Sequence, residues 1–410
     1  MDRRTFLGAV SAAGLTAAGA PLRQAFAATA AGPGGRVKRV AVIGAGIVGA
    51  SIAWYLSKRG ADVLLLDKSG PAAQASGNSF AWLNASWYDK PDSYFWLRTH
   101  SINEYHRLAA EIEFPIRWGG SLEWYHSLEE QEEMAAGVRR IQRFGAPTWM
   151  VDPARVAAIE PGVDLGGDWR AGWCSRDGAI DPAAATRALV DGVRANGGQA
   201  IFPAEVTGLE QQNDGVRVVT NAGTFSVDLV VVAAGIDANN VASLAGIDKQ
   251  LLGPPRSGII VTTRPTEAQV NTVCYTPDSH FHQLPDGRLV VGEKAGAPQT
   301  DDHNELFRER PNAYPKAELA MQHAWRVIDT ASAHCPSLSD AEVESVGVGW
   351  RPLPVDGLPI VGHVPDAPRV YLAAMHSGVT LAPIIGHLAA MEILDGVSVD
   401  LLTDFRIDRL

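Results

Sequence analysis

Along residues 37–67 the hydrophobic pattern predicts a strand, a helix and a second strand. Uninterrupted apolar residues cover Val40–Ile43 and Val63–Leu66, which is typical of parallel strands that are covered on both faces. Gly60 ends the helical segment between them. This order of elements is that of the βαβ unit that binds dinucleotides.

The turn of this unit and its last residue carry the candidate chemistry. In Gly44-x-Gly46-x-x-Gly49, Gly44 allows a tight turn, Gly46 lets a pyrophosphate approach the backbone, and Gly49 lets the helix lie close to the sheet. The helix N-terminus offers N–H groups to phosphate, and Asp67 can accept hydrogen bonds from a ribose. A glycine-rich turn without a ligand is the alternative, and the two flanking strands and Asp67 disfavour it.

The rest of the pattern predicts further helices and two kinds of strand. Helical spacing covers residues 92–112 and 306–333, a helix that starts with Asp181-Pro182 runs to Asn196, and another covers about Thr380–Leu394. Strands are predicted at Arg117–Tyr125 (a strand or a hairpin around Gly119-Gly120), Ala200–Phe202, Val216–Thr220, Phe225–Ala234, Leu251–Thr263, Asn271–Val291 with a turn at Pro285–Gly287, and Val370–Ala374.

These elements predict an α/β fold with a second, α+β lobe. A discontinuous dinucleotide-binding domain would contain residues 37–86, 176–246 and 343–410, and an antiparallel-sheet substrate domain would contain residues 87–175 and 247–342. The ligand would lie where the two domains meet.

Charge and composition exclude several classes of protein. The 410 residues carry a formal charge of −11, so a nucleic-acid partner is not expected. The three cysteines, Cys174, Cys274 and Cys335, show no CxxC spacing, which indicates neither a disulfide framework nor a metal site.

Residues 1–30 are expected to be a twin-arginine signal peptide rather than part of the fold. Arg3-Arg4 precedes a weakly apolar Ala/Gly-rich stretch, and Ala25-Phe26-Ala27 matches a cleavage site. We therefore expect export by the twin-arginine machinery to the periplasm or outside the cell, with the cofactor already bound. An uncleaved tail or anchor is the alternative.

Several separated blocks resemble the D-amino-acid-oxidase superfamily of flavoproteins, most of all its glycine oxidase and sarcosine oxidase branch. They are Val42–Gly49 with Asp67, Ala75–Ser79, Asp177–Pro182 with Val230–Gly235, Gly349–Gly362, His376–Pro383 and the tail Phe405–Arg409. The blocks span nearly the whole mature chain, and their order is more specific than any one of them.

The resemblance implies that the dinucleotide is FAD, bound without a covalent link. Its pyrophosphate would lie over the glycine-rich turn, its ribose at Asp67 and its adenine against the Val206 backbone, while the start of a C-terminal helix would face the flavin. The residues implied in cofactor binding are Gly44, Gly46, Ile47, Val48, Gly49, Asp67, Lys68, Ser76, Gly77, Asn78, Ser79, Val206, Ala234, Gly235, Arg351, Ser377, Gly378, Val379, Thr380 and Leu381.

Three residues are candidates for catalysis by the same resemblance. Arg351 matches the position that holds the substrate carboxylate, and the alternative is an internal pair with Asp356. His282 stands where relatives place a carboxylate-binding tyrosine, although a structural histidine is the alternative, and His280 has a weaker case. His376 lies beside the expected flavin, where Met375 replaces the glycine of the family pattern.

The implied reaction is FAD-dependent oxidation of an amino acid or secondary amine to an imine, which water hydrolyses. The substrate stays open among glycine, sarcosine, a D-amino acid, a cyclic imino acid and a larger N-substituted amino acid. The electron acceptor could be oxygen or a quinone, and the assembly could be a homo-oligomer. The other hypotheses are a flavoprotein that uses NAD(P)H, which lacks a second GxGxxG motif here, and a flavin-binding protein without catalysis.

Overall fold

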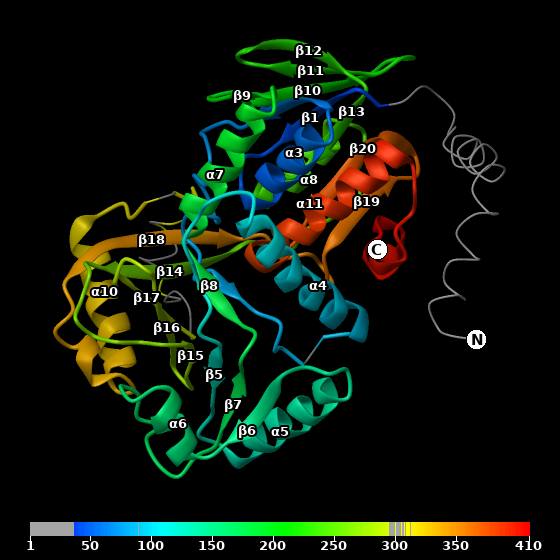
Figure 1. The fold of residues 1–410 in the computed structure, drawn as a ribbon. Helices are drawn as coiled ribbons and strands as arrows, with labels where there is room; N and C mark the ends of the chain where they lie inside the picture. The colour runs from blue at the N-terminus through cyan, green and yellow to red at the C-terminus, as the bar shows by residue number, and fades with distance from the viewer. Residues whose placement is uncertain are drawn as a thin grey trace, which may run out of the picture.

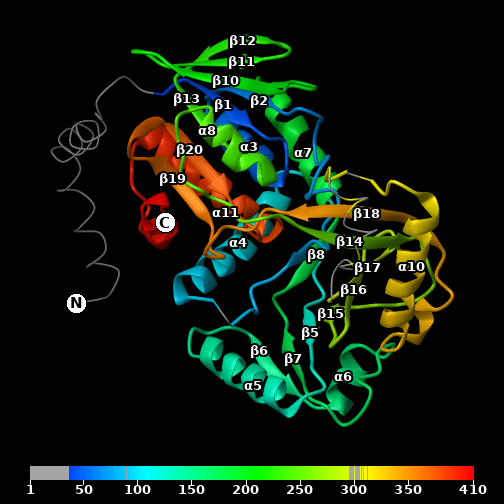
Figure 2. The same ribbon diagram turned by 180° about the vertical axis from the view of Figure 1, so that it is seen from behind.

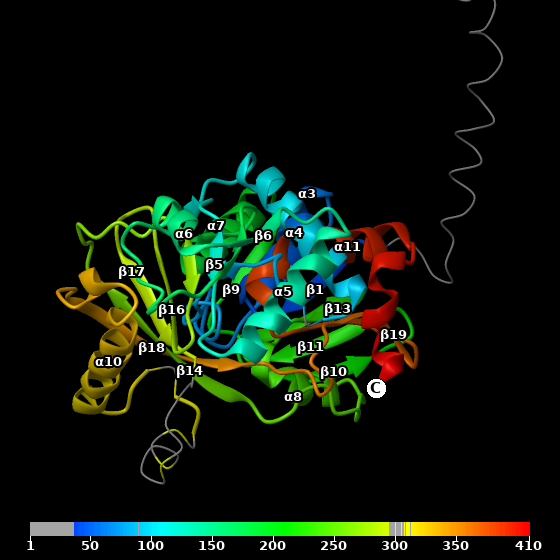
Figure 3. The ribbon, with the colours of Figure 1, turned by 90° about the horizontal axis from the view of Figure 1, so that it is seen from below.

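The computed structural model describes residues 37–410 except 89, 295–299, 301–304, 306, 308 and 312. The predicted signal peptide, residues 1–30, lies outside the described residues. Within them, two larger sheets lie side by side, one of them mostly parallel and the other mostly antiparallel (Figures 1 and 3).

The six-stranded sheet contains the βαβ unit. Its order is β19-β20-β13-β1-β2-β9, and all pairs are parallel except β19 with β20. The strands are β1 (Arg39–Ile43), β2 (Asp62–Leu66), β9 (Gln199–Ile201), β13 (Leu229–Val232), β19 (Ile360–Val364) and β20 (Ala367–Ala374). Alternate side chains of β1 enter two different hydrophobic cores, which explains why its apolar run is uninterrupted.

Four helices share the core on one face of this sheet. They are α3 (Ile47–Lys58), α4 (Asp92–Ala109), α7 (Pro182–Ala195) and α11 (Gly378–Asp395). The other face is covered by α8 (Ala238–Ser243) and by a small antiparallel sheet of β10 (Val206–Gln211), β11 (Val216–Thr220) and β12 (Gly223–Val227), seen at the top of Figure 2. Asp181 caps α7 as predicted, because its carboxylate accepts the Ala184 N–H.

The eight-stranded sheet has the order β18-β14-β17-β16-β15-β5-β7-β6. Its strands are β5 (Ser121–Glu123), β6 (Thr148–Val151), β7 (Ala171–Cys174), β14 (Arg256–Thr263), β15 (Val273–Tyr275), β16 (Ser279–Gln283), β17 (Leu289–Glu293) and β18 (Val343–Arg351). Helix α10 (Ala317–Ser332) packs on one end of it, and α5 (Leu128–Gln142) and α6 (Pro153–Ile159) lie at the other (Figure 1). A third sheet, β3 (Trp82–Leu83), β8 (Gly178–Ile180) and β4 (Ile116–Arg117), lies between the two parts.

Four predicted elements were wrong in detail. Arg117–Tyr125 is not a hairpin, because β4 pairs with β8 whereas β5 pairs with β7 and β15. The strand predicted over Phe225–Ala234 is two strands, since the Asp228 carboxylate accepts the N–H groups of Lys38 and Arg39 at the break. Proline residues at 311 and 315 precede α10, which begins at Ala317, and positions 306, 308 and 312 of that predicted helix lie outside the described residues. Pro254-Pro255 delay β14 to Arg256.

The boundary predicted at residue 343 precedes a strand of the other sheet. Strand β18 pairs along its length with β14 of the eight-stranded sheet and only then leads into the six-stranded one. In both Figures 1 and 2, β18 runs from the side of α10 toward α11, so its last residue, Arg351, lies where the two sheets approach each other.

Helix α11 is long and apolar enough to cross a membrane by length and composition alone. However, 67% of its most hydrophobic window is buried inside the protein, and most of its side chains contribute to the core that α3 and α4 share. The apolar composition of α11 is therefore explained by core packing.

Candidate active site

A large cavity, of about 710 Å³, collects most of the predicted site residues from both sheets. One end is formed by the βαβ turn, Asp67 and Val206, and the other by Arg351, His376 and residues of the eight-stranded sheet. Of the residues predicted to contact the cofactor, Gly49, Gly77 and Leu381 do not line the cavity, and all the others do.

The glycine-rich turn fits closely against the sheet and the helix. Gly44 has φ +109°, and a Cβ at this position would lie 2.3 Å from the Ala233 oxygen. A Cβ at Gly49 would lie 1.9 Å from the Gly44 oxygen. Gly49 therefore acts by packing, while Gly44, Gly46 and the first turn of α3 face the cavity.

Asp67 fixes the shape of the turn from the end of β2. Its Oδ2 accepts the Ala45 N–H at 2.8 Å, and its Oδ1 accepts the N–H groups of Ser69 and Gly70. Each carboxylate oxygen can accept more than one hydrogen bond, so Asp67 can hold the turn and still accept from a ribose. The adjacent Lys68 pairs with Asp237 at 2.8 Å across the same end of the cavity.

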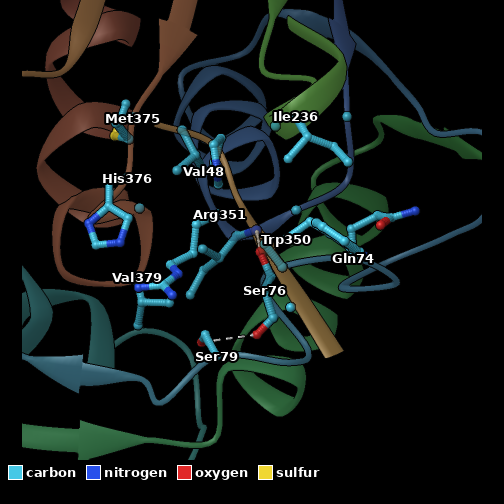
Figure 4. A pocket seen from close by; sticks show the side chains of 18 of the residues that line it. Val48, Gln74, Ser76, Ser79, Ile236, Trp350, Arg351, Met375, His376 and Val379 are labelled. Carbon is cyan, nitrogen blue, oxygen red and sulfur yellow. Dashed lines mark hydrogen bonds between the residues drawn. The ribbon is translucent and has the colours of Figure 1, made fainter. Parts of the chain in front are cut away.

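The loop around Ser76 continues this cradle. The Ser76 hydroxyl oxygen accepts the Ile47 N–H at 3.0 Å, so its own hydrogen is directed away from α3 and can be donated to a phosphate. Figure 4 shows Ser79 beside it, and the Ser79 hydroxyl donates to the Ser76 carbonyl at 3.3 Å. Gly77 instead shapes the loop, because its N–H donates to the Ala72 carbonyl and it does not line the cavity.

The start of α11 forms the opposite wall. Ser377, Gly378, Val379 and Thr380 line the cavity, and Thr380 is held in place because its hydroxyl donates to the Trp82 carbonyl at 2.9 Å. Leu381 is fully buried in the core behind them. The positive end of the α11 dipole therefore faces the cavity, where it favours negative charge.

Arg351 enters the cavity from the last position of β18 (Figure 4). Its Nη2 donates to the Ser257 carbonyl at 3.0 Å, which holds the guanidinium against β14. Asp356, the alternative partner, is engaged in a bidentate pair with Arg409 at 2.6 and 3.1 Å. The internal Arg351–Asp356 pair is therefore wrong, and the guanidinium can receive a carboxylate.

The structure exchanges the roles expected for His280 and His282. His282 lies outside the large cavity, 1% exposed, with Nε2 2.7 Å from the Phe80 carbonyl. His280 lines the cavity instead, stacked against Tyr275 with an angle of 11° between the rings. The geometry thus favours the structural alternative for His282, and His280 is the histidine of β16 that lines the cavity.

Burial of His282 leads to a prediction about acid stability. Loss of solvation lowers the pKa of His282 from 6.5 to about 4. Below pH 6.5 the unfolded chain therefore takes up a proton that the folded chain does not, and the free energy of unfolding falls until about pH 4, by up to about 3 kcal/mol from this residue. In denaturant titrations over this pH range, the free energy of unfolding of His282→Gln should depend less steeply on pH, by the equivalent of about one proton. An unchanged slope would contradict a buried, neutral His282.

His376 faces the cavity from the turn between β20 and α11. His376 is exposed toward the cavity, where partial desolvation and the positive charges of Arg351 and Arg98 lower its pKa below 6.5. The imidazole is therefore neutral near pH 7, so one of its ring nitrogens can accept a hydrogen bond from an amine.

Sequence reasoning missed a buried carboxylate beneath the cavity wall. Asp177 accepts hydrogen bonds from Trp82 Nε1, the Ala85 N–H, and the hydroxyls of Ser86 and Ser121. It thereby fixes Trp82, which lines the cavity. Asp177 lies in a block already similar to the flavoproteins, but its donors come from distant segments that no local pattern connects.

A family of known proteins fits this geometry. The family described as "DAO: FAD dependent oxidoreductase" matches residues 39–391 of the chain. The chain belongs to this family. The match confirms the predicted superfamily, the α/β fold class and FAD as the cofactor.

Individual relatives are distant but cover nearly the whole protein. The chain is 26% identical to a glycine oxidase of Bacillus licheniformis over 90% of this chain and 96% of that one. It is 27% identical, over the same shares, to one component of the opine oxidase of Agrobacterium tumefaciens. In structure it resembles glycine oxidase from Geobacillus kaustophilus, with a TM-score of 0.80, 22% identity, and coverage of 91% of this chain and 99% of that one.

The residues present fit FAD. The turn at Gly44–Gly49 and Ser76 provide backbone N–H groups and a hydroxyl for the pyrophosphate, and Asp67 and Val206 lie at the end that suits the ribose and adenine. The α11 N-terminus lies at the other end, where the flavin would come. Among the described residues, no group of His, Cys, Asp and Glu could hold a metal ion.

Proposed function

We propose that this protein oxidises an amino acid or secondary amine at the carbon next to nitrogen. The observation that carries the proposal is Arg351, a carboxylate-binding side chain that faces the flavin end of the cavity while Asp356 is engaged by Arg409. The glycine oxidase and opine oxidase among the relatives support the same class of reaction.

The side chains around Arg351 have distinct tasks in this proposal. The Arg351 fork binds the substrate carboxylate, and neutral His376 accepts an N–H of the substrate amine, which orients the neighbouring C–H. Trp82, Trp87 and Phe80 line the same end and exclude water. FAD, when bound, would supply the hydride-accepting chemistry, and the α11 N-terminus would favour negative charge at the flavin end of the cavity.

We propose that FAD is held without a covalent bond. None of the three cysteines lines the cavity, and all three are buried within the described part of the chain. No cysteine occurs in the Gly349–Gly362 block either. Acid precipitation should therefore release all of the flavin into the supernatant.

Anaerobic mixing with a panel of amino acids and amines tests the reaction. Loss of visible flavin absorbance with at least one of them is the expected result, and readmission of air followed by a peroxide assay distinguishes oxygen from a quinone-type acceptor. Reduction by NADPH but by no amine would instead favour the NAD(P)H-dependent class. If neither NADPH nor any amine or amino acid reduces the flavin, a flavin-binding protein without catalysis would be favoured.

We propose further that residues 1–30 export the folded protein through the twin-arginine route, on the evidence of Arg3-Arg4 and Ala25–Ala27. The double variant Arg3→Lys with Arg4→Lys should retain the flavoprotein in the cytoplasmic fraction, whereas the parent chain should reach the periplasm with FAD bound. Equal distribution of the two proteins would exclude this route.

A further inference from the structure

A second cation, Lys294, lines the same cavity as Arg351. It follows β17 directly, and its Nζ lies 4.1 Å from the ring centre of Tyr125 and 5.2 Å from that of Tyr275. In the described part of the chain, Lys294 forms no ion pair with a carboxylate. The ammonium group is therefore held by two aromatic faces, which position a cation without neutralising it.

The carboxylates around Lys294 are committed elsewhere or exposed. Glu293, its neighbour in the chain, pairs with Arg326. Glu123 accepts the Tyr125 hydroxyl, and Glu130 accepts the Ser127 hydroxyl at 2.7 Å. Asp278 is exposed. Burial lowers the pKa of Lys294 below its usual value, and the charges of Glu130, Glu123 and Asp278 only partly oppose this shift.

Lys294 and Arg351 share the cavity with a neutral aromatic wall. Tyr275 and His280 form it, stacked with ring centres 5.9 Å apart, and Phe80 packs edge-on against His280 at 4.3 Å. Burial lowers the pKa of His280 from 6.5 to about 3, and the positive charges of Arg351 and Lys294 act in the same direction. His280 is uncharged near neutral pH, so the wall leaves the two positive charges uncompensated.

We infer that Arg351 and Lys294 bind the two carboxylates of a single dicarboxylic substrate, and this inference rests on the proposed amine oxidation. Arg351 holds the carboxylate next to the reacting carbon, and Lys294 holds a distal carboxylate on the nitrogen substituent or on the side chain. Two fixed positive charges in a partly buried cavity favour a dianion over a substrate with one carboxylate. The substrate class is then an N-carboxyalkyl amino acid or an amino dicarboxylic acid.

Matched pairs of small amines test the distal site. Iminodiacetate differs from sarcosine by one carboxylate, so the ratio of kcat/KM for these two compounds, measured by anaerobic flavin reduction, reports on that group alone. The ratio should exceed one in the parent protein. In Lys294→Met, which keeps an unbranched apolar side chain, the ratio should fall about 30-fold, mainly through KM for iminodiacetate.

Two further variants make the result specific. Lys316→Met removes an exposed lysine outside the cavity and should leave the ratio unchanged. Lys294→Glu should reverse the preference toward amino acids that carry a distal amine, such as ornithine. Flavin content should equal that of the parent protein in every variant, which reports on folding.

The outcomes separate this inference from the proposed function. If sarcosine and iminodiacetate reduce the flavin equally well, or if Lys294→Met leaves their ratio unchanged, the distal carboxylate site is wrong while amine oxidation stands. If no amine or amino acid of either class reduces the flavin, the proposed function itself fails.

Discussion

Replacing Arg351 with methionine should lower kcat/KM for the amino-acid substrate on the order of 10²–10³-fold while FAD stays bound. The variant removes the charge and the two parallel N–H donors that a carboxylate requires, but keeps the apolar part of the side chain. The guanidinium donates to the Ser257 carbonyl while Asp356 pairs with Arg409, so the variant does not leave Asp356 without its partner. Most of the loss should appear in KM.

Arg256 provides the matched control for this variant. It lies directly opposite Arg351 in the β14–β18 pair, but its side chain does not line the cavity. Arg256→Met should therefore change kcat/KM less than about threefold, in the range of an ordinary surface substitution. An amine without a carboxylate should react equally with the parent protein and with Arg351→Met. Unchanged KM for the amino acid in Arg351→Met would remove Arg351 from the binding site.

The nucleotide half of the site could be predicted because its function is encoded within one continuous segment. Gly44, Gly46 and Gly49 meet Asp67 through a single βαβ unit, and Asp67 indeed accepts the Ala45 N–H of the turn. The start of α11 at Gly378 is likewise determined by residues that are neighbours in the sequence. In both places, residue type and spacing determine the backbone geometry, so a short pattern was sufficient.

The substrate half depends on strand register and on long-range contacts. His280 and His282 are two positions apart on β16, so strand alternation places both on the same face and cannot decide which of them reaches the cavity. The position of the Lys294 ammonium group depends on Tyr125 and Tyr275, which come from separate segments of the chain. Asp177 collects donors from residues 82–86 and from Ser121. Only the folded structure brings these groups together.

Gly49→Ala should yield a protein almost without flavin, although alanine in place of glycine within a helix normally stabilises by up to about 1 kcal/mol. Gly49 lies in the first turn of α3, and its added Cβ would lie 1.9 Å from the Gly44 oxygen, so the helix and the turn must separate. That separation displaces the N–H groups that would bind the pyrophosphate. Flavin per polypeptide in the purified protein should fall to less than about a tenth of the parent value, since these N–H groups are shared by the whole cradle.

Gly60→Ala tests whether this loss follows from the contact or merely from a lost glycine. Gly60 ends α3 with φ +85°, and an added Cβ there meets nothing within 4 Å. Alanine at this position should cost about 1 kcal/mol of stability through its left-handed backbone, yet flavin content should equal that of the parent. By intrinsic backbone preference alone, Gly60→Ala would be the more damaging of the two variants, which is the opposite of the expected order of flavin loss. Full flavin occupancy in Gly49→Ala would therefore mean that close packing between α3 and the turn is not what forms the FAD site.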